Sequence, residues 1–255
     1  MTLWMLRLPL DPSRLARHAA ERGWMHRRGH DEGRALHHLL TETFGKTDGQ
    51  VPKSAFQPFR LLSGKGGSSL YGYSTVAPET LRETAAAIAP PEALALLPLP
   101  NLQAKPMPQT WRLGQVLGFD LRARPVVRLN SAIPPDRDPL GRGFRQGAEI
   151  DAYVAAQARS PAPVARNRVY LDWLAARLAP AAELIRDGTV LHRFQRSQAL
   201  RRGLSEGPDA VFHGTLRITD PDRFALLLSR GVGRHCAYGF GMLLLRAPQS
   251  PPLEA

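Results

Sequence analysis

The sequence predicts an α+β protein made of two ferredoxin-like domains in tandem, each with an antiparallel sheet and helices on one face. Strand-like apolar runs and apolar faces with helical spacing follow one another through the first half in the order β-α-β-β-α-β. The second half approximates the same order, although the chain contains no clear internal sequence repeat. The duplication is therefore inferred from element order. RNA-binding (RRM-like) folds often use this order, but a fold does not assign a function.

The first domain is expected over residues 1–129. Asp11 followed by Pro12 is a helix N-cap signal, Pro78 opens another helix, and a glycine–lysine turn separates two strand-like runs. These signals predict a strand at 2–10, helices at 13–22 and 24–44, strands at 56–62 and 70–76, a helix at 78–88 and a strand or strand pair at 115–129.

Residues 130–165 differ from the rest of the chain in composition, because they are rich in proline, glycine and arginine. We expect a linker or insertion there, partly ordered, with a short helix near 149–158. The second domain is expected over residues 166–248. Its predicted elements are a helix at 168–178, a basic hairpin at 190–202, a strand at 210–218, a helix after Asp220-Pro221, a glycine-rich loop at 231–241 and a last strand at 242–245.

The composition indicates a polyanionic partner. The 255 residues carry a formal net charge of +12 with a pI near 10.9, which makes nucleic acid the first candidate and a solvated arginine-rich surface the second. The single cysteine, Cys236, excludes an internal disulfide and a cysteine-based zinc site. No acidic cluster has metal-ligand spacing, and no apolar run is long enough to cross a membrane. We therefore expect a cytoplasmic protein without metal or cofactor.

The glycine-rich loop is the most distinctive stretch. Its glycines would let backbone N–H groups approach a phosphate, and basic side chains stand beside them. A tight turn that needs glycine is the plainer interpretation. The residues concerned are Arg230, Gly231, Gly233, Arg234, His235, Gly239 and Gly241.

Basic residues also recur every fourth position near the second predicted helix, and this spacing predicts a stripe along that helix. A solvated polar face and a histidine metal site are the alternatives. The stripe comprises Arg22, His26, His30, Arg34 and His38.

Four short motifs follow one another along nearly the whole chain. They are Leu8-Pro9-Leu10 with Met25-His26-Arg27, Leu121-Arg122-Ala123-Arg124-Pro125 with Arg128, Arg168-Val169-Tyr170 with Trp173-Leu174, and Arg230-Gly231-Val232-Gly233 with Tyr238-Gly239-Phe240-Gly241. In this order the chain resembles the CRISPR repeat-processing endoribonucleases of the CasE type, members of the repeat-associated (RAMP) RNA-binding superfamily. Divergent relatives in type IV CRISPR systems are an alternative resemblance. The resemblance implies tandem ferredoxin-like domains that cut a repeat hairpin in precursor crRNA without metal and then stay bound in an effector complex.

The chemistry of such a cut can be stated from first principles. The 2′-OH of RNA attacks the adjacent phosphate in line, which leaves a 2′,3′-cyclic phosphate and a 5′-OH. The reaction needs a base, an acid and cations for the developing charge. His26 matches the family's catalytic histidine and would act as general acid or base, with Arg27, Arg22 or Arg34 near the phosphate. Relatives often carry a tyrosine shortly before this histidine, whereas this chain has Arg22-Gly23-Trp24. His30, His37, His38 or an arginine cluster could take the role instead.

RNA contacts are expected from arginines spread over both domains and from the glycine-rich loop. The basic hairpin would hold the stem, and the loop and the strand near 122–124 would hold the backbone at the cut. The expected RNA-binding residues are Arg34, Arg122, Arg124, Arg128, Arg193, Arg196, Arg201, Arg202, Arg230, Gly231, Gly233, Arg234, His235, Gly239 and Gly241.

Two other functions share these basic features. One is a non-catalytic subunit that binds an RNA hairpin within a CRISPR ribonucleoprotein, and the other is a basic RNA-binding protein outside CRISPR. The non-catalytic subunit differs from the nuclease only in that it does not cut the RNA that it binds. The expected partners are CRISPR repeat RNA, or the crRNA hairpin, and other effector subunits.

Overall fold

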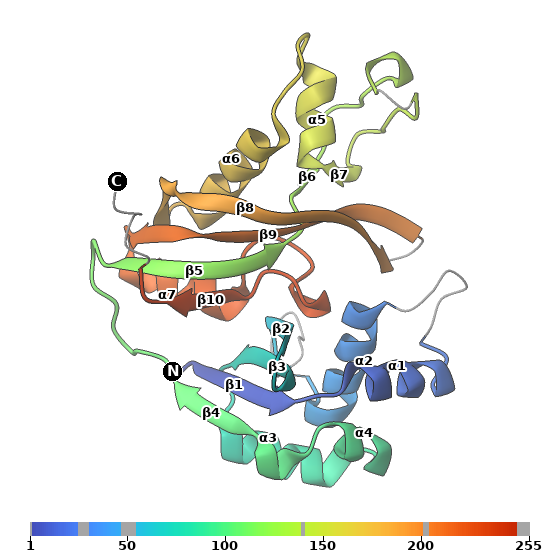
Figure 1. Ribbon diagram of the computed structural model, residues 1–255, viewed down its shortest axis with the longest axis vertical. Coiled ribbons are helices and arrows are strands. Elements are labelled where there is room, and N and C mark those ends of the chain that lie inside the picture. Colours follow the sequence, from blue (N-terminus) through green and yellow to red (C-terminus); the bar gives the residue numbers. More distant parts are fainter. Residues whose placement is uncertain (1, 25–30, 47–54, 139–140, 201–203, 249–255) are drawn as a thin grey trace. The chain divides into compact units, whose positions relative to one another are not determined.

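The computed structural model describes residues 2–24, 31–46, 55–138, 141–200 and 204–248 (Figure 1). Contacts group the chain into two compact units. The first comprises Met1–Trp111, Gln198–Ser205 and Ala225–Met242, and the second comprises Arg112–Ser197, Glu206–Phe224 and Leu243–Ala255. Within the described residues, no helix is both long and apolar enough to cross a membrane.

The first sheet has the ferredoxin-like order β2-β3-β1-β4, with the first and third strands in the centre. Antiparallel pairing joins β1 to β3, β1 to β4 and β2 to β3. The strands are β1 (Trp4–Pro9), β2 (Phe59–Gly64), β3 (Gly67–Ser74) and β4 (Gln103–Pro106).

The fourth strand of this sheet lies where the sequence predicts only a proline-rich stretch. An edge strand tolerates proline, because one of its sides makes no ladder hydrogen bonds. The expectation that 115–129 supplies this strand is wrong, since β5 (Val116–Ala123) pairs with β9 and β10, and β6 (Val126–Arg128) pairs with β7 (Glu149–Asp151).

Helices begin where capping residues place them. Asp11 accepts hydrogen bonds from the first turn of α1 (Pro12–Glu21), as the sequence predicts. The second helix, however, is α2 (Glu32–Phe44), because the Asp31 carboxylate caps it by accepting from the backbone N–H of Arg34. The remaining helices of this unit are α3 (Pro78–Ile88), α4 (Pro91–Leu96) and the short η1 (Leu99–Asn101).

The start of α2 at Glu32 separates Arg22 from the other described residues of the predicted basic stripe. Arg22 follows the end of α1, whereas Arg34 and His38 lie on α2. His26 and His30 are outside the described residues. Arg22 therefore does not share a helix with the other two.

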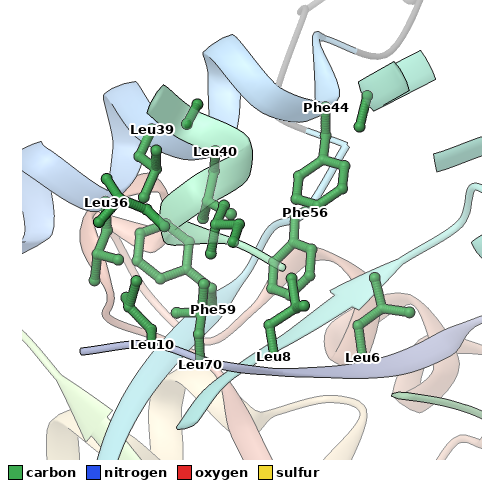
Figure 2. Close-up of a cluster of buried hydrophobic side chains, with 14 of the residues drawn as sticks. Leu6, Leu8, Leu10, Leu36, Leu39, Leu40, Phe44, Phe56, Phe59 and Leu70 are labelled. Carbon is green, nitrogen blue, oxygen red and sulfur yellow. The ribbon is translucent and has the colours of Figure 1, made fainter. Parts of the chain in front are cut away.

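One face of the first sheet packs on α2 and α3. Figure 2 shows Leu6 and Leu8 of β1, and Leu10 directly after it, pointing toward the leucines of α2, and these side chains are at most 3% exposed. Phe44 stacks on Phe56 with ring centroids 5.5 Å apart. Burial of each large apolar side chain stabilises the fold by about 1.5–3 kcal/mol. Because side chains alternate along β1, Met5, Arg7 and Pro9 lie on its other face.

The second sheet repeats the same arrangement in the order β10-β5-β9-β8. Here β5 takes the place of β1, β9 that of β3, β8 that of β2 and β10 that of β4. The predicted tandem ferredoxin-like fold is confirmed, but the opening strand of the second sheet comes from residues that the sequence assigns to the first domain. The further elements are β8 (Ala182–Leu200), β9 (Leu204–Ile218), β10 (Leu243–Arg246), α6 (Arg166–Leu178), α7 (Pro221–Arg230) and η3 (Cys236–Tyr238).

The stretch expected as a linker carries structure of its own. It contains η2 (Pro135–Arg137), β7 and α5 (Ala152–Arg159), so the predicted short helix is confirmed. A small core of Leu129, Ile133 and Ile150 stabilises it together with alanines of α5.

Candidate functional site

Aromatic and imidazole rings form a continuous row in the first unit, which we call the imidazole cluster. His18 meets the edge of Trp24 at 5.2 Å between centroids, and Trp24 stacks on His38 at 5.1 Å. His37 lies 5.6 Å from His38 and 5.1 Å from Tyr238. The cluster joins α1, the turn after it, α2 and η3 of the glycine-rich loop. These five residues were not predicted to lie together.

Helix α2 can lie close to the loop because Gly33 has no side chain. A Cβ there would clash with the backbone carbonyl of Tyr238. One turn later, the Nε of Arg34 donates to Nε2 of His38 over 3.4 Å. A guanidinium can only donate, so this nitrogen of His38 must carry a lone pair. The structure therefore places Arg34 beside a neutral imidazole.

Both histidines of α2 favour the neutral form. Burial lowers the pKa of His37, and the nearby charges of His38 and Lys46 lower it further. Burial also lowers the pKa of His38; the charge of Arg34 adds to this effect, and Glu42 opposes it. A neutral imidazole can accept a proton, which makes either ring chemically suited to act as a base.

The residues predicted to be catalytic are only partly described. His26 and Arg27 lie outside the described residues. Arg22 donates to the carboxylate of Glu42 over 2.6 Å, and its guanidinium carbon lies 5.7 Å from the centroid of the Trp24 ring. Arg22 is thus held beside the imidazole cluster.

The glycine-rich loop has an unusual backbone. Four of its glycines have φ between 78° and 83°, and His235, which is not a glycine, has φ 67°. At Gly241 a Cβ would lie 2.6 Å from Sγ of Cys236, so only glycine fits. The backbone N–H of Val232 closes the loop by donating to the carbonyl of Gly241 over 2.8 Å. The tight-turn role of the glycines is therefore present.

Basic side chains surround this loop. Arg230 at the end of α7 and Arg234 are exposed. The His235 ring lies 6.4 Å from that of Tyr238, which belongs to the imidazole cluster. The loop and the cluster therefore form one continuous region within the first unit. Gly231, Gly233 and Gly239 shape the backbone there without contributing charge.

In the second unit, Arg122 holds a buried carboxylate. Its Nε and Nη2 donate to the two oxygens of Asp209 over 2.9 and 2.7 Å, and Gln195 donates to the same group over 2.9 Å. Burial favours the protonated form of Asp209. The hydrogen bonds and charge of Arg122, with help from Gln195 and Arg193, outweigh it and lower the pKa. Arg122 is thus committed to an ion pair inside the protein.

Arg124 is also internal. Its side chain is among the largest that are fully buried, and its Nη2 donates to the carbonyl of Ser197 over 3.0 Å. A Cβ on Gly207 would clash with this guanidinium. Arg128 is exposed and donates to the carbonyl of Gly147 over 3.1 Å.

Residues 190–200 of the predicted basic hairpin lie on β8, which is the neighbour of β9 in the second sheet. Arg193 is exposed. Arg196 lies 3.9 Å from Asp151 and 3.5 Å from the carboxylate of Glu206. Arg201 and Arg202 lie outside the described residues. Arg193 differs from Arg196 in its surroundings. Among the described residues, no carboxylate oxygen lies within 4.0 Å of its guanidinium nitrogens.

Sequence reasoning missed the cluster around Trp24 and Tyr238. The one signal was an aromatic residue directly before the histidine-rich stretch and another inside the glycine-rich loop. It also missed that His192 stacks on His213 at 4.0 Å, with Asp120 3.3 Å from the latter. Tyr170 and Trp173 are buried, as expected for core residues.

Comparisons with known proteins agree with this fold. Cse3 of Thermus thermophilus, bound to an RNA representing a pre-cleavage complex, has a TM-score of 0.59 at 19% identity, covering 96% of this chain and all of that one. Cas6e from Escherichia coli K-12 has a TM-score of 0.51 at 16% identity, covering 98% and 100%. A chain of a CRISPR RNA-guided surveillance complex has a TM-score of 0.51 at 15% identity, covering 96% and 99%.

The curated proteins contain no match to this chain. A family model described as "CRISPR associated protein" matches residues 3–247, which is nearly the whole sequence. The chain therefore belongs to this family of CRISPR-associated proteins.

Proposed function

We propose that this protein is an endoribonuclease that cuts the hairpin of CRISPR repeat RNA in precursor crRNA. The observation that carries the proposal is the family match over residues 3–247. The shared fold with Cse3, which was solved on an RNA representing a pre-cleavage complex, supports it. The net charge of +12 fits a polyanionic substrate.

The reaction proceeds by in-line attack of the 2′-OH, without a metal ion, and yields a 2′,3′-cyclic phosphate and a 5′-OH. His26 serves as the general acid or base, worth about 10²–10⁴ in rate. Trp24, two positions earlier, is stacked in the imidazole cluster. His38 and His37 are the alternative bases, because their lowered pKa values keep them neutral near pH 7.

Cations stabilise the charge that develops on the phosphate. We assign this role to Arg22, which is held beside the imidazole cluster, to Arg27, and to Arg230 and Arg234 of the glycine-rich region. Support comes from the contact between the loop and the imidazole cluster at Tyr238, because it joins a glycine-rich turn with arginine side chains to the proton-transfer groups.

The stem of the hairpin is held by the strands β8 and β9. The major groove of A-form RNA is deep and narrow, so proteins bind its shape and backbone. Arg193, Arg196, Arg201 and Arg202 provide phosphate contacts there. Because Arg122 and Arg124 are engaged inside the protein, they support these strands and contact RNA less than the sequence predicts.

The product stays bound, and the protein becomes a subunit of a CRISPR effector complex. The shared fold with a chain of an RNA-guided surveillance complex supports this part of the proposal. The second candidate is a subunit that binds the hairpin without cutting it. The absence of a tyrosine at Trp24, where relatives often have one shortly before the histidine, favours this candidate.

The test is cleavage of a labelled cognate repeat hairpin in EDTA. Wild type should cut it and leave a cyclic phosphate, while a substrate with a 2′-deoxy at the cut should bind uncut. His26→Ala should lower the single-turnover rate by about 10²–10⁴ without changing the dissociation constant. His38→Ala tests the alternative base in parallel. Tight binding without cutting would establish the second candidate.

A further inference from the structure

The outer face of the first sheet carries exposed polar and basic side chains near its β4 edge, whereas Tyr73 and Arg60 on the same face are buried. Strand pairing sets Arg7 opposite Tyr71 on β3 and opposite Gln103 on β4, and sets Met5 opposite Lys105. Residues opposite each other in a pair share a face, so these side chains lie on the side away from the core in Figure 2. Arg7, Gln103 and Lys105 are exposed.

Arg7 is held in place by neighbours on both sides. Its Nε donates to the hydroxyl of Ser69 over 3.2 Å and its Nη1 to the side-chain carbonyl of Gln103 over 3.4 Å. Its guanidinium carbon lies 5.8 Å from the centroid of the Tyr71 ring. Among the described residues no carboxylate lies within 4.0 Å of it. The guanidinium of Arg7 is therefore held in one orientation, and it has further N–H groups that can donate to a bound anion.

Two adjoining hollows extend from this face, and we call them together the β1 groove. One has a volume of about 350 Å³ and is lined by Arg7, Ser69, Asn101 and Gln103. The other, of about 600 Å³, is lined by residues that include Arg14 and the backbone of 66–68. Pro9 and Asn101 line both hollows, so the groove is continuous from the sheet face to the start of α1 and the tip of the β2–β3 hairpin.

The charges of the groove favour an anionic polymer. Arg7 and Arg14 line it, Lys65 lies at the hairpin tip next to it, and Asp11 is the acidic residue in its lining. The Asp11 carboxylate is already engaged in capping α1. The polar amides of Asn101 and Gln103 can pair with base edges, and the partly exposed ring of Tyr71 beside Arg7 offers a stacking surface for a base.

We propose that the β1 groove binds single-stranded RNA that flanks the repeat hairpin. The inference rests on the proposed function, because it takes the hairpin as bound elsewhere on the protein. Phosphates contact Arg7 and Arg14, and the unpaired bases contact Tyr71 and the groove amides. A duplex is a poorer occupant, because its base edges are paired and the amides and ring could not reach them.

The experiment compares two RNAs, the repeat hairpin alone and the same hairpin with a single-stranded extension on its 5′ or 3′ side. Wild type should bind one extended RNA more tightly than the bare hairpin. Arg7→Gln/Arg14→Gln should abolish that gain while leaving the affinity for the bare hairpin unchanged. Arg17→Gln is the matched control, because Arg17 lies on the same helix, is exposed and does not line the groove.

The salt dependence of binding measures how many phosphate contacts the double variant loses. Each phosphate contact to a single strand contributes about 0.7 to the slope of log affinity against log salt, so the double variant should lower the slope by about 1.4 on extended RNA only. Between 50 and 200 mM salt this corresponds to about a sevenfold difference in relative affinity. An equal loss on both RNAs, an equal effect of Arg17→Gln, or no gain from either extension would overturn the inference. A bare hairpin that neither binds nor is cut would instead overturn the proposed function.

Discussion

Removing the guanidinium of Arg122 should destabilise the second unit far more than it weakens RNA binding. The Asp209 side chain has no exposed surface, and Arg122 supplies two of its three hydrogen bonds from side chains. Loss of one partner of a buried ion pair costs about 3–5 kcal/mol. Because Gln195 remains and the Arg122 side chain is 21% exposed, we expect the lower limit, about 3 kcal/mol, for Arg122→Gln.

The assay is thermal unfolding together with RNA affinity. For a protein of this size, about 3 kcal/mol corresponds to a fall in Tm of roughly 6–12 °C. Arg193→Gln is the matched control, because Arg193 is exposed on the same strand as Gln195 and should change stability by less than about 0.5 kcal/mol. The two variants should show the opposite order in RNA affinity. At a temperature where both are folded, Arg193→Gln should weaken RNA binding more than Arg122→Gln does.

A double variant isolates the pair. In Arg122→Gln/Asp209→Asn the buried group is no longer charged, so much of the lost stability should return. The lowered pKa of Asp209 also means that its contribution is present above the unfolded pKa and is lost as pH falls through the folded value. An Arg122→Gln protein that melts like wild type but no longer binds RNA would refute this reasoning and restore the direct RNA role.

Two further predictions concern the first unit. Gly241→Ala forces a left-handed residue and a contact with Sγ of Cys236, so it should cost about 1–3 kcal/mol by thermal unfolding, whereas Gly66→Ala, which meets nothing within 4 Å, should not. Because the pKa of His37 and of His38 is lower in the folded protein, the unfolded chain binds more protons just below pH 6.5, and the free energy of unfolding should fall there as pH falls. Urea unfolding at pH 7.5 and 5.5 should show a weaker pH dependence for His37→Phe, and an unchanged dependence would contradict the assignment.

Elements with local signals could be predicted closely. The Asp11-Pro12 cap and the proline at 78 mark helix starts through contacts within one turn, and both α1 and α3 begin there. The start of α2 was missed because Asp31, inside a basic stretch, provides the cap. Strand β4 was missed because it ends at Pro106 within a proline-rich stretch, and only an edge position tolerates proline in a sheet.

The candidate site was harder to predict than the helices, because it is formed by residues that are far apart in the sequence. Arg122 and Asp209 are separated by 87 positions, and no local pattern shows that the arginine is already engaged. Trp24 and Tyr238 meet through α2, which the sequence could not bring to the glycine-rich loop. By contrast, Arg193, Arg230 and Arg234, which the sequence predicts to contact RNA, are exposed, and their RNA contacts stay a prediction.

The composition of the first unit also bears on how the protein is made. Residues 1–111 leave the ribosome early, but Ala225–Met242 belongs to the same unit. At about 5–20 residues per second, the intervening segment delays that partner by on the order of ten seconds. During that interval Gly33 and Phe59, which the loop covers through Tyr238 and Gly239, stay open to other contacts. Strand β10, which completes the second sheet, follows directly after the loop, so a chain stopped before residue 225 would lack both the loop of the first unit and the edge strand of the second sheet.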